Sequence, residues 1–125
     1  MAQGSTGEPV IRRAADIEYE TIDVADGLAK GVLLNEDHGA PNVALRRFTL
    51  AAGGSVPKHT NEVEHEQYVL SGEYVLGIDD TEYNVSPGDS IHIPAETVHW
   101  YRNEGDTDGA FICAVPTGDD EIELA

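Results

Sequence analysis

Short apolar stretches alternate with polar turn residues along the whole chain, and none keeps a helical period of about 3.6 residues for more than one or two turns. The apolar stretches are about 4–8 residues long and rich in Val, Ile, Leu, Tyr and Phe, which is typical of β-strands. One or two edge strands are expected within residues 10–24, where short apolar pairs are mixed with Asp and Glu. The main strands are predicted at 28–34, 43–50, 66–70, 73–78, 82–85, 90–93, 98–102 and 110–115.

Turn residues separate these stretches. Residues 35–42 read Asn-Glu-Asp-His-Gly-Ala-Pro-Asn and predict a loop, and Ser71-Gly72 predicts a tight hairpin between the strands on either side. Ser86-Pro87-Gly88-Asp89 has the composition of a β-turn, in which Gly is free to take a positive φ. Further turns or loops are predicted at 51–54, 79–81, 94–96 and 103–109.

The spacing of the turns indicates the class of fold. Many short strands with turn signals about every 8–12 residues predict an all-β sandwich or barrel. A chain of 125 residues has room for one domain with a real core and is too short for two. We expect this single domain over residues 10–116, with a flexible N-terminal tail at 1–9 and an acidic C-terminal tail at 117–125.

The charge balance is far from neutral, with 24 acidic and 7 basic residues and a formal net charge of -17. A field this negative repels phosphates, so nucleic acid is not expected as a partner. One interpretation of the acidic surface is high solubility. The other is adaptation to a salt-rich cytoplasm, where counter-ions screen the self-repulsion, and it predicts a halophilic protein.

Two features of the sequence bear on location. No apolar run approaches the roughly 18 residues that span a bilayer, and the N-terminus lacks the basic start and apolar core of a signal peptide. Cys113 is the single cysteine, which excludes an internal disulfide framework and fits a reducing compartment. We therefore expect a cytoplasmic protein with no membrane partner.

Three of the five histidines carry the candidate chemistry. His59 and His65 lie six residues apart in a strand-like context, and His99 follows in a later strand. Residues i and i+2 of a strand face the same side, so Asn61 shares a face with His59, and Gln67 shares one with His65. If the strands curl into a barrel, the three imidazoles can meet inside it. Because neutral imidazoles are the commonest ligands of divalent transition metals, the pattern predicts a metal site.

The spacing around these histidines resembles the two sequence motifs of the cupin family. The first motif fits residues 53–72, with a gap of five residues between its first Gly and His59 and a gap of six between His65 and its last Gly. The second motif ends in His, three residues and Asn, which fits His99 and Asn103. The similarity runs from about residue 42 to residue 116, which is most of the chain.

Within that family, the chain is most similar to small single-domain cupins with a four-histidine manganese site. In those proteins a His stands inside a Glu-His-Glu string, as His65 does here. The resemblance implies a jelly-roll barrel, also called a double-stranded β-helix. One position departs from the pattern, because the second His of the first motif is replaced by Asn61.

The implied cofactor is one divalent metal ion. Three imidazoles without a carboxylate suit Mn, Fe, Ni, Cu or Zn, and the resemblance favours Mn or Fe. Asn61 either binds the ion or a metal-bound water through its carbonyl oxygen, or forms hydrogen bonds without touching the metal. Gln67 is a candidate catalytic residue that donates a hydrogen bond near the ligands, with an ordinary strand position as the alternative. The alternative carboxylate ligands, which we expect to face solvent, are Glu62, Glu64 and Glu66.

The other two histidines are not assigned to the metal. His38 lies in the predicted loop at 35–42 and is expected to be solvated. His92 lies seven residues before His99, on the strand that enters the second motif, and the sequence leaves its facing open.

A substrate pocket is expected beside the metal. Arg46 is a candidate catalytic residue, because similar small cupins carry an Arg that faces the site and can bind a carboxylate through two hydrogen bonds; the alternative is an ion pair with a surface acid. Phe111 and Cys113 alternate on the last strand, and the resemblance directs their shared face towards the metal. Phe48 is assigned to the same pocket. Cys113 is interpreted as pocket wall and not as a nucleophile.

The resemblance implies a metal-dependent, oxygenase-like enzyme acting on a small organic molecule. Two alternatives stay open, a non-catalytic module that binds or senses a small ligand and a sugar isomerase, and the shape of the fold does not choose among them. The chain has few cations to hold a phosphate, which disfavours a sugar-phosphate substrate. A homodimer is expected, because single-domain cupins usually pair and bury the exposed sheet edges of two barrels against each other.

Overall fold

The computed structural model describes residues 7–118 and 122–125, and the regular structure of this part is almost entirely β. Ten strands and two short 3-10 helices are present, which confirms the all-β prediction. The 3-10 helices are η1 (Ala14–Asp16) and η2 (Glu36–His38). The strands are β1 (Tyr19–Thr21), β2 (Asp26–Leu34), β3 (Val43–Asn61), β4 (His65–Ser71), β5 (Tyr74–Ile78), β6 (Thr81–Val85), β7 (Ser90–Ile93), β8 (His99–Arg102), β9 (Gly109–Pro116) and β10 (Ile122–Leu124).

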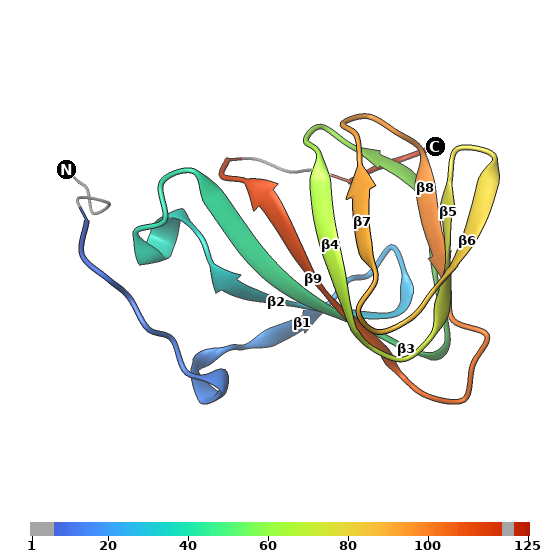
Figure 1. Ribbon diagram of the computed structural model, residues 1–125, viewed down its shortest axis with the longest axis horizontal. Helices are drawn as coiled ribbons and strands as arrows, with labels where there is room; N and C mark the ends of the chain where they lie inside the picture. The colour runs from blue at the N-terminus through green and yellow to red at the C-terminus, as the bar shows by residue number, and fades with distance from the viewer. Residues whose placement is uncertain (1–6, 119–121) are drawn as a thin grey trace.

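The strands form a curled sheet whose two halves face each other across the core (Figure 1). One half has the order β1-β2-β3-β9-β4-β7, and the other has the order β10-β3-β8-β5-β6. All of these neighbours pair antiparallel. The result is the predicted jelly-roll barrel.

Strand β3 belongs to both halves of the barrel. Its first part pairs with β2 and β9, and its last part pairs with β8 and β10. The turn predicted at 51–54 is therefore wrong, because the strand bends there without ending. Gly53 has a φ of 80°, and a Cβ on Gly54 would lie 2.6 Å from the carbonyl oxygen of Asp26, so both positions need glycine for the bend.

The tight hairpin predicted at Ser71-Gly72 is also wrong. Strand β4 pairs with β7 and β9, whereas β5 pairs with β6 and β8, so the chain crosses from one half of the barrel to the other at this point. Gly72 makes the crossing with a φ of 73°, and a Cβ there would lie 2.5 Å from the carbonyl oxygen of Asp108. A tight hairpin and this crossover both use a glycine with a positive φ, so the glycine alone does not tell the two connections apart.

Two other predicted turns are confirmed. Residues Asp79 and Asp80 join β5 and β6 in a hairpin whose last pair is Ile78 with Thr81. Between β6 and β7, the amide of Asp89 donates to the carbonyl of Ser86 at 3.0 Å.

The C-terminal residues include a short strand. Part of the predicted acidic tail, residues 122–124, pairs with residues 59–61 of β3. Of the predicted N-terminal tail, residues 1–6 lie outside the described residues, and residues 7–9 have no regular structure.

The core lies between the two halves of the barrel. Its largest fully buried apolar side chains are Leu50, Leu76, Ile93 and Val69, each of which contributes about 1.5–3 kcal/mol through burial. Among the described residues, no helix has the length and apolar character needed to cross a membrane.

Candidate metal centre

A bulge in β3 turns His59 into the barrel. Val56 pairs with Tyr101 and His59 pairs with His99, so two residues of β3, Pro57 and Lys58, lie opposite the single residue between those partners on β8. The extra residue shifts the alternation of the strand by one. Even-numbered side chains face inward before the bulge, as Val56 does, and odd-numbered ones, including His59, face inward after it.

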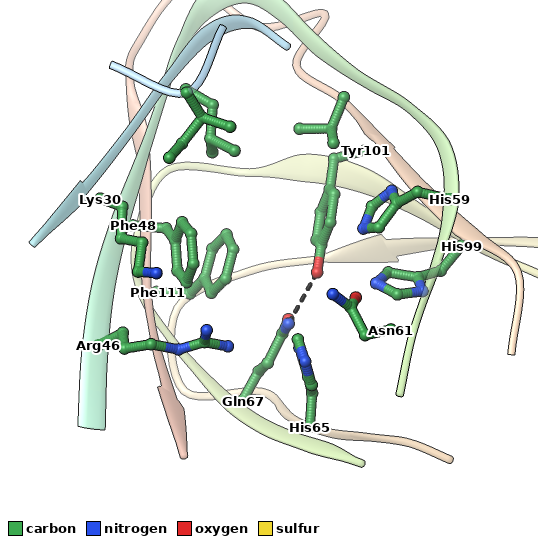
Figure 2. A pocket seen from close by; sticks show the side chains of 13 residues that line it. Lys30, Arg46, Phe48, His59, Asn61, His65, Gln67, His99, Tyr101 and Phe111 are labelled. Atoms are coloured by element: carbon green, nitrogen blue, oxygen red, sulfur yellow. Dashed lines mark hydrogen bonds between the residues drawn. The ribbon is translucent and has the colours of Figure 1, made fainter. Parts of the chain in front are cut away.

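The three predicted histidines come together in the structure. His59, His65 and His99 are all buried, and their side chains gather at one end of the same pocket with Asn61 (Figure 2). The ring centroids of His59 and His99 are 4.1 Å apart, and those of His65 and His99 are 6.0 Å apart. Strands β3, β4 and β8 each supply one of these imidazoles, so the barrel fixes their positions through strand pairing.

Backbone carbonyls orient two of the rings. The Nδ1 of His59 lies 2.7 Å from the carbonyl oxygen of Pro57, and the Nδ1 of His99 lies 2.9 Å from that of Thr97. A carbonyl only accepts, so each neutral ring carries its proton on Nδ1 and presents the lone pair of Nε2. This is the tautomer that a metal ligand needs, and the donor set therefore fits a divalent ion.

Cys113 links His65 to the cationic part of the pocket. Its buried Sγ accepts a hydrogen bond from Arg46 at 3.5 Å and lies 4.0 Å from the Nε2 of Gln67. Burial alone would raise the pKa of the thiol, but the contacts with His65 and Arg46 outweigh burial and lower that pKa below its ordinary value.

Gln67 and Tyr101 form a buried polar pair beside the histidines. The Nε2 of Gln67 donates to the Tyr101 hydroxyl at 2.7 Å, and the Oε1 of Gln67 has no hydrogen-bond partner among the described residues. Burial raises the pKa of Tyr101 well above its ordinary value, although the Gln67 hydrogen bond acts in the opposite direction. The phenol is therefore neutral at physiological pH and retains a proton to donate.

Stacked aromatic rings line the pocket between the histidines and the cations (Figure 2). The centroids of Phe48 and Phe111 are 5.1 Å apart with planes at 18°, and those of Tyr101 and Phe111 are 5.4 Å apart with planes at 12°. The guanidinium of Arg46 lies 5.3 Å from the centroid of Phe48. The cavity has a volume of about 70 Å³.

The sequence interpretation missed Lys30 and Tyr101 as pocket residues. Both line the cavity together with the predicted Arg46, Phe48 and Phe111. A signal for Lys30 was available, because it is one of two lysines in the chain and lies inside a predicted apolar strand at 28–34. The pocket side chain of Tyr101 follows that of His99 by two residues on β8, so the same alternation that was applied to the histidines would have found it.

The remaining histidines lie outside this pocket. His38 is in the short η2 helix, where its Nδ1 accepts a hydrogen bond from the amide of Asn35 at 3.1 Å. His92 faces outward from β7, with its Nδ1 2.6 Å from a carboxylate oxygen of Glu66 and 3.7 Å from one of Glu64. The predicted ligand assignment excluded both histidines.

The group around His92 is an exposed place where three acidic or histidine side chains among the described residues bring their ligand atoms close together. Glu64, Glu66 and His92 each place one such atom within 4.8 Å of the others, and all three side chains are exposed. A hydrogen bond with the carboxyl group of Glu66, together with repulsion from its charge, raises the pKa of Glu64. These glutamates and Glu62 face outward, as expected.

Comparison with known proteins identifies the family. A family model described as a cupin domain (Cupin_2) matches residues 46–115, which is more than half of the chain. The chain belongs to the cupin family. As a cupin it is 39% identical over 51 residues to quercetin 2,3-dioxygenase from Bacillus subtilis (strain 168), a match that covers 40% of this chain and 15% of that relative. The chain therefore spans only a small part of this relative's length.

Two solved structures are similar to this cupin over most of its length. The polyketide cyclase RemF from Streptomyces resistomycificus is 26% identical with a TM-score of 0.83, and the match covers 93% of this chain and 86% of that one. A predicted oxalate decarboxylase from Thermotoga maritima is 26% identical with a TM-score of 0.74, covering 87% of this chain and 100% of that one. All three relatives are described as enzymes.

Proposed function

We propose that this cupin is a metal-dependent enzyme that acts on a small organic acid. One divalent ion, Mn or Fe in our preferred assignment, would be held by His59, His65 and His99. The observation that carries the proposal is the geometry of the imidazoles, which are buried together and, for His59 and His99, held by backbone carbonyls in the tautomer that binds a metal.

Each residue around the histidines has a role in this proposal. When bound, the ion supplies Lewis-acid or redox chemistry at positions left open by the three imidazoles. Asn61 contributes its amide oxygen, either to the ion or to a water beside it. Gln67 holds the neutral Tyr101 in place, and the phenol donates its proton to a developing negative charge on the substrate.

The cations at the far end of the pocket support an acidic substrate. Arg46 and Lys30 line the same cavity as the histidines, so a carboxylate at their end leaves the rest of the substrate directed towards the metal. Pockets for drug-sized ligands measure roughly 300–1,000 Å³. A cavity of about 70 Å³ therefore suits a small acid better than a multi-ring molecule.

A dioxygenase-like reaction is our first assignment, supported by the similarity to quercetin 2,3-dioxygenase. The second is a non-oxidative cyclase- or decarboxylase-like reaction. It is supported by the two structural neighbours at 26% identity and by the neutral Tyr101, which is suited to proton donation. Oxygen consumption by the Fe(II)- or Mn(II)-loaded protein with small keto acids separates the two assignments. Tight binding with neither oxygen consumption nor product would favour the ligand-binding module.

Metal analysis of protein purified without a His-tag tests the site. We expect His59→Ala and His99→Ala to lose most of the bound metal, because each removes one of three imidazoles. His38→Ala is the matched control and should bind as much metal as the unaltered protein, since His38 lies in the η2 helix. Equal metal content in all three variants would refute the assignment.

A homodimer and a cytoplasmic location complete the proposal. An apolar surface on the outer face of the barrel supports the dimer, and it consists of Val43, Leu45, Tyr68, Ile112 and Ala114. The charged side chains that border it on the same strands are Arg47, opposite Ile112, and Glu66, opposite Ala114, in a chain with a net charge of -17. A second copy is the partner that this surface fits, because two equally acidic molecules repel each other least where acids are few. The free thiol of Cys113 supports a reducing compartment.

A further inference from the structure

The C-terminal strand β10 lies along the part of β3 that carries two of the metal-site residues. Leu124 pairs with His59, Glu123 with Thr60 and Ile122 with Asn61. On its other edge the same part of β3 pairs with β8, where His99 lies opposite His59. At His59 the strand is therefore the middle of a three-stranded ladder. At Thr60 and Asn61 the paired strand is β10, and the carbonyl of Asn61 also accepts a hydrogen bond from the amide of Glu96 at 2.8 Å.

The last residue of the chain also contacts the bulge. The amide of Ala125 donates to the carbonyl of Lys58 at 3.0 Å. Lys58 is one of the two bulge residues that set the inward facing of His59. Without β10, both the bulge and the ligand end of β3 would lie at an open sheet edge, where backbone positions are held less firmly.

The side chains of Glu123 and Leu124 in β10 contribute little to the core. Leu124 is 63% exposed and Glu123 is exposed as well. The stabilisation expected from burial of Leu124 is correspondingly small. The ordering of residues 58–61 is therefore the consequence of this pairing that the backbone contacts support.

We propose that β10 is a positioning element of the metal centre, which holds His59 and Asn61 in their binding geometry without touching the ion. The inference rests on the proposed function, because it assigns these two residues to a metal. Partners that orient a metal ligand typically change the affinity by about 10–100-fold when they are removed. Loss of β10 should therefore weaken metal binding while the barrel stays folded.

The test compares the full chain with a chain that ends at residue 121, using Co²⁺ as the probe. We expect the truncated chain to bind Co²⁺ at least about tenfold more weakly, with altered visible absorption bands, and its metal-free thermal midpoint to fall by only a few degrees. Two point variants test the contact of the last residue with Lys58. Ala125→Pro removes the amide hydrogen that is donated to the Lys58 carbonyl, and Ala125→Gly keeps it. Only the proline variant should bind more weakly than the full chain. Unchanged Co²⁺ affinity and absorption in the truncated chain would overturn the inference.

A metal-free measurement separates the inference from the proposed function. In the apo-protein, NMR signals of the His59 ring should shift on truncation, whereas those of Phe48 on the first part of β3 should not. If the His59 signals stay in place, β10 is not a positioning element, whether or not the protein binds metal. If they shift but the full chain binds no Co²⁺, the positioning by β10 stands and the metal assignment of His59, His65 and His99 fails.

Discussion

Tyr74 has a buried hydroxyl group that the fold does not satisfy. The side chain is 3% exposed and packs against Tyr101 and Phe111, but its hydroxyl has no hydrogen-bond partner among the described residues. A buried polar group without a partner costs about 1–3 kcal/mol of stability. Burial is also the main reason that the pKa of Tyr74 is raised above its ordinary value, and repulsion from Asp89 adds to it.

We expect Tyr74→Phe to increase the free energy of unfolding by about 1 kcal/mol or more, because it removes the unsatisfied hydroxyl and keeps the ring. The raised pKa also predicts a pH dependence. Above about pH 10 the unfolded chain loses the Tyr74 proton and the folded protein keeps it, so stability falls with rising pH, by up to about 1.4 kcal/mol per unit.

Urea unfolding at pH 8 and at pH 11 measures both effects. Tyr74→Phe should be the more stable protein at pH 8, and its advantage should grow at pH 11. The exposed Tyr83→Phe is the control and should match the unaltered protein. A loss of stability in Tyr74→Phe would mean that the hydroxyl has a partner.

At the scale of residues, the sequence predicted which three histidines lie close together and predicted the pocket only in part. His59, His65 and His99 were predictable because their spacing resembles a family motif and because alternation assigns side chains to faces. The backbone carbonyls that orient His59 and His99 depend on local geometry that composition does not encode. Lys30 was missed because its role depends on β2 lying beside β3, which is a matter of strand pairing.

At the element scale, two glycines with positive φ differ in how closely they are packed. Comparing them separates the effect of backbone strain from that of a steric clash. Gly72 has a φ of 73° and lies against the backbone of Asp108, where a Cβ would be 2.5 Å from the carbonyl oxygen. Gly88 has a φ of 96°, but a Cβ there would have no heavy atom within 4 Å. The crossover between β4 and β5 is therefore much less tolerant of a side chain than the turn between β6 and β7.

We predict that Gly72→Ala lowers the free energy of unfolding by more than about 2 kcal/mol, because it adds a steric clash to the backbone strain. Gly88→Ala should cost only about 1 kcal/mol, since it introduces the strain alone. Chemical denaturation of the two variants and the unaltered protein compares them directly. Equal losses would mean that the chain at the crossover relaxes to admit the methyl group.

At the scale of elements, the positions of the strands could be predicted but not all of their partners. Alternation and turn residues located most strands to within a few residues, because these signals are local. The continuation of β3 through 51–54 and the crossing at Gly72 were missed, because a glycine with positive φ serves a turn, a bend and a crossover equally well. The partner of a strand is decided by long-range packing that no short window contains.

Charge is the dominant property of the whole molecule. With a net charge of -17 on 125 residues, the folded state brings like charges closer together than the unfolded state does. Salt at about 1 M reduces the screening length to about 3 Å and removes most of this repulsion. We expect the thermal midpoint to rise as the salt concentration increases from a few millimolar to molar.

The measurement is a series of thermal unfolding curves in KCl at constant pH. A second series in potassium formate is the control. The same rise in the thermal midpoint would show that the effect comes from screening and not from chloride. A midpoint that stays constant or falls with salt would refute the interpretation of the composition as halophilic.

The proposed dimer surface makes a separate prediction. Tyr68 is 50% exposed on the outer face of β4, so Tyr68→Glu would place two further carboxylates in a contact between copies. We expect this variant to sediment as a monomer when the unaltered protein is a dimer. Tyr83→Glu is the matched control, because Tyr83 is 49% exposed on β6 in the other half of the barrel and should leave the dimer intact. A dimer with Tyr68→Glu would exclude this surface.

The extra residue at the bulge divides β3 into two parts that differ in which side chains face inward, even-numbered ones before the bulge and odd-numbered ones after it. Arg46 and Phe48 lie before Pro57-Lys58, and His59 and Asn61 lie after it. Shortening the chain by one residue at this point would turn the imidazole of His59 outward and leave the guanidinium of Arg46 where it is. One residue therefore decides whether the proposed metal ligand on β3 faces the same cavity as the proposed substrate-binding arginine.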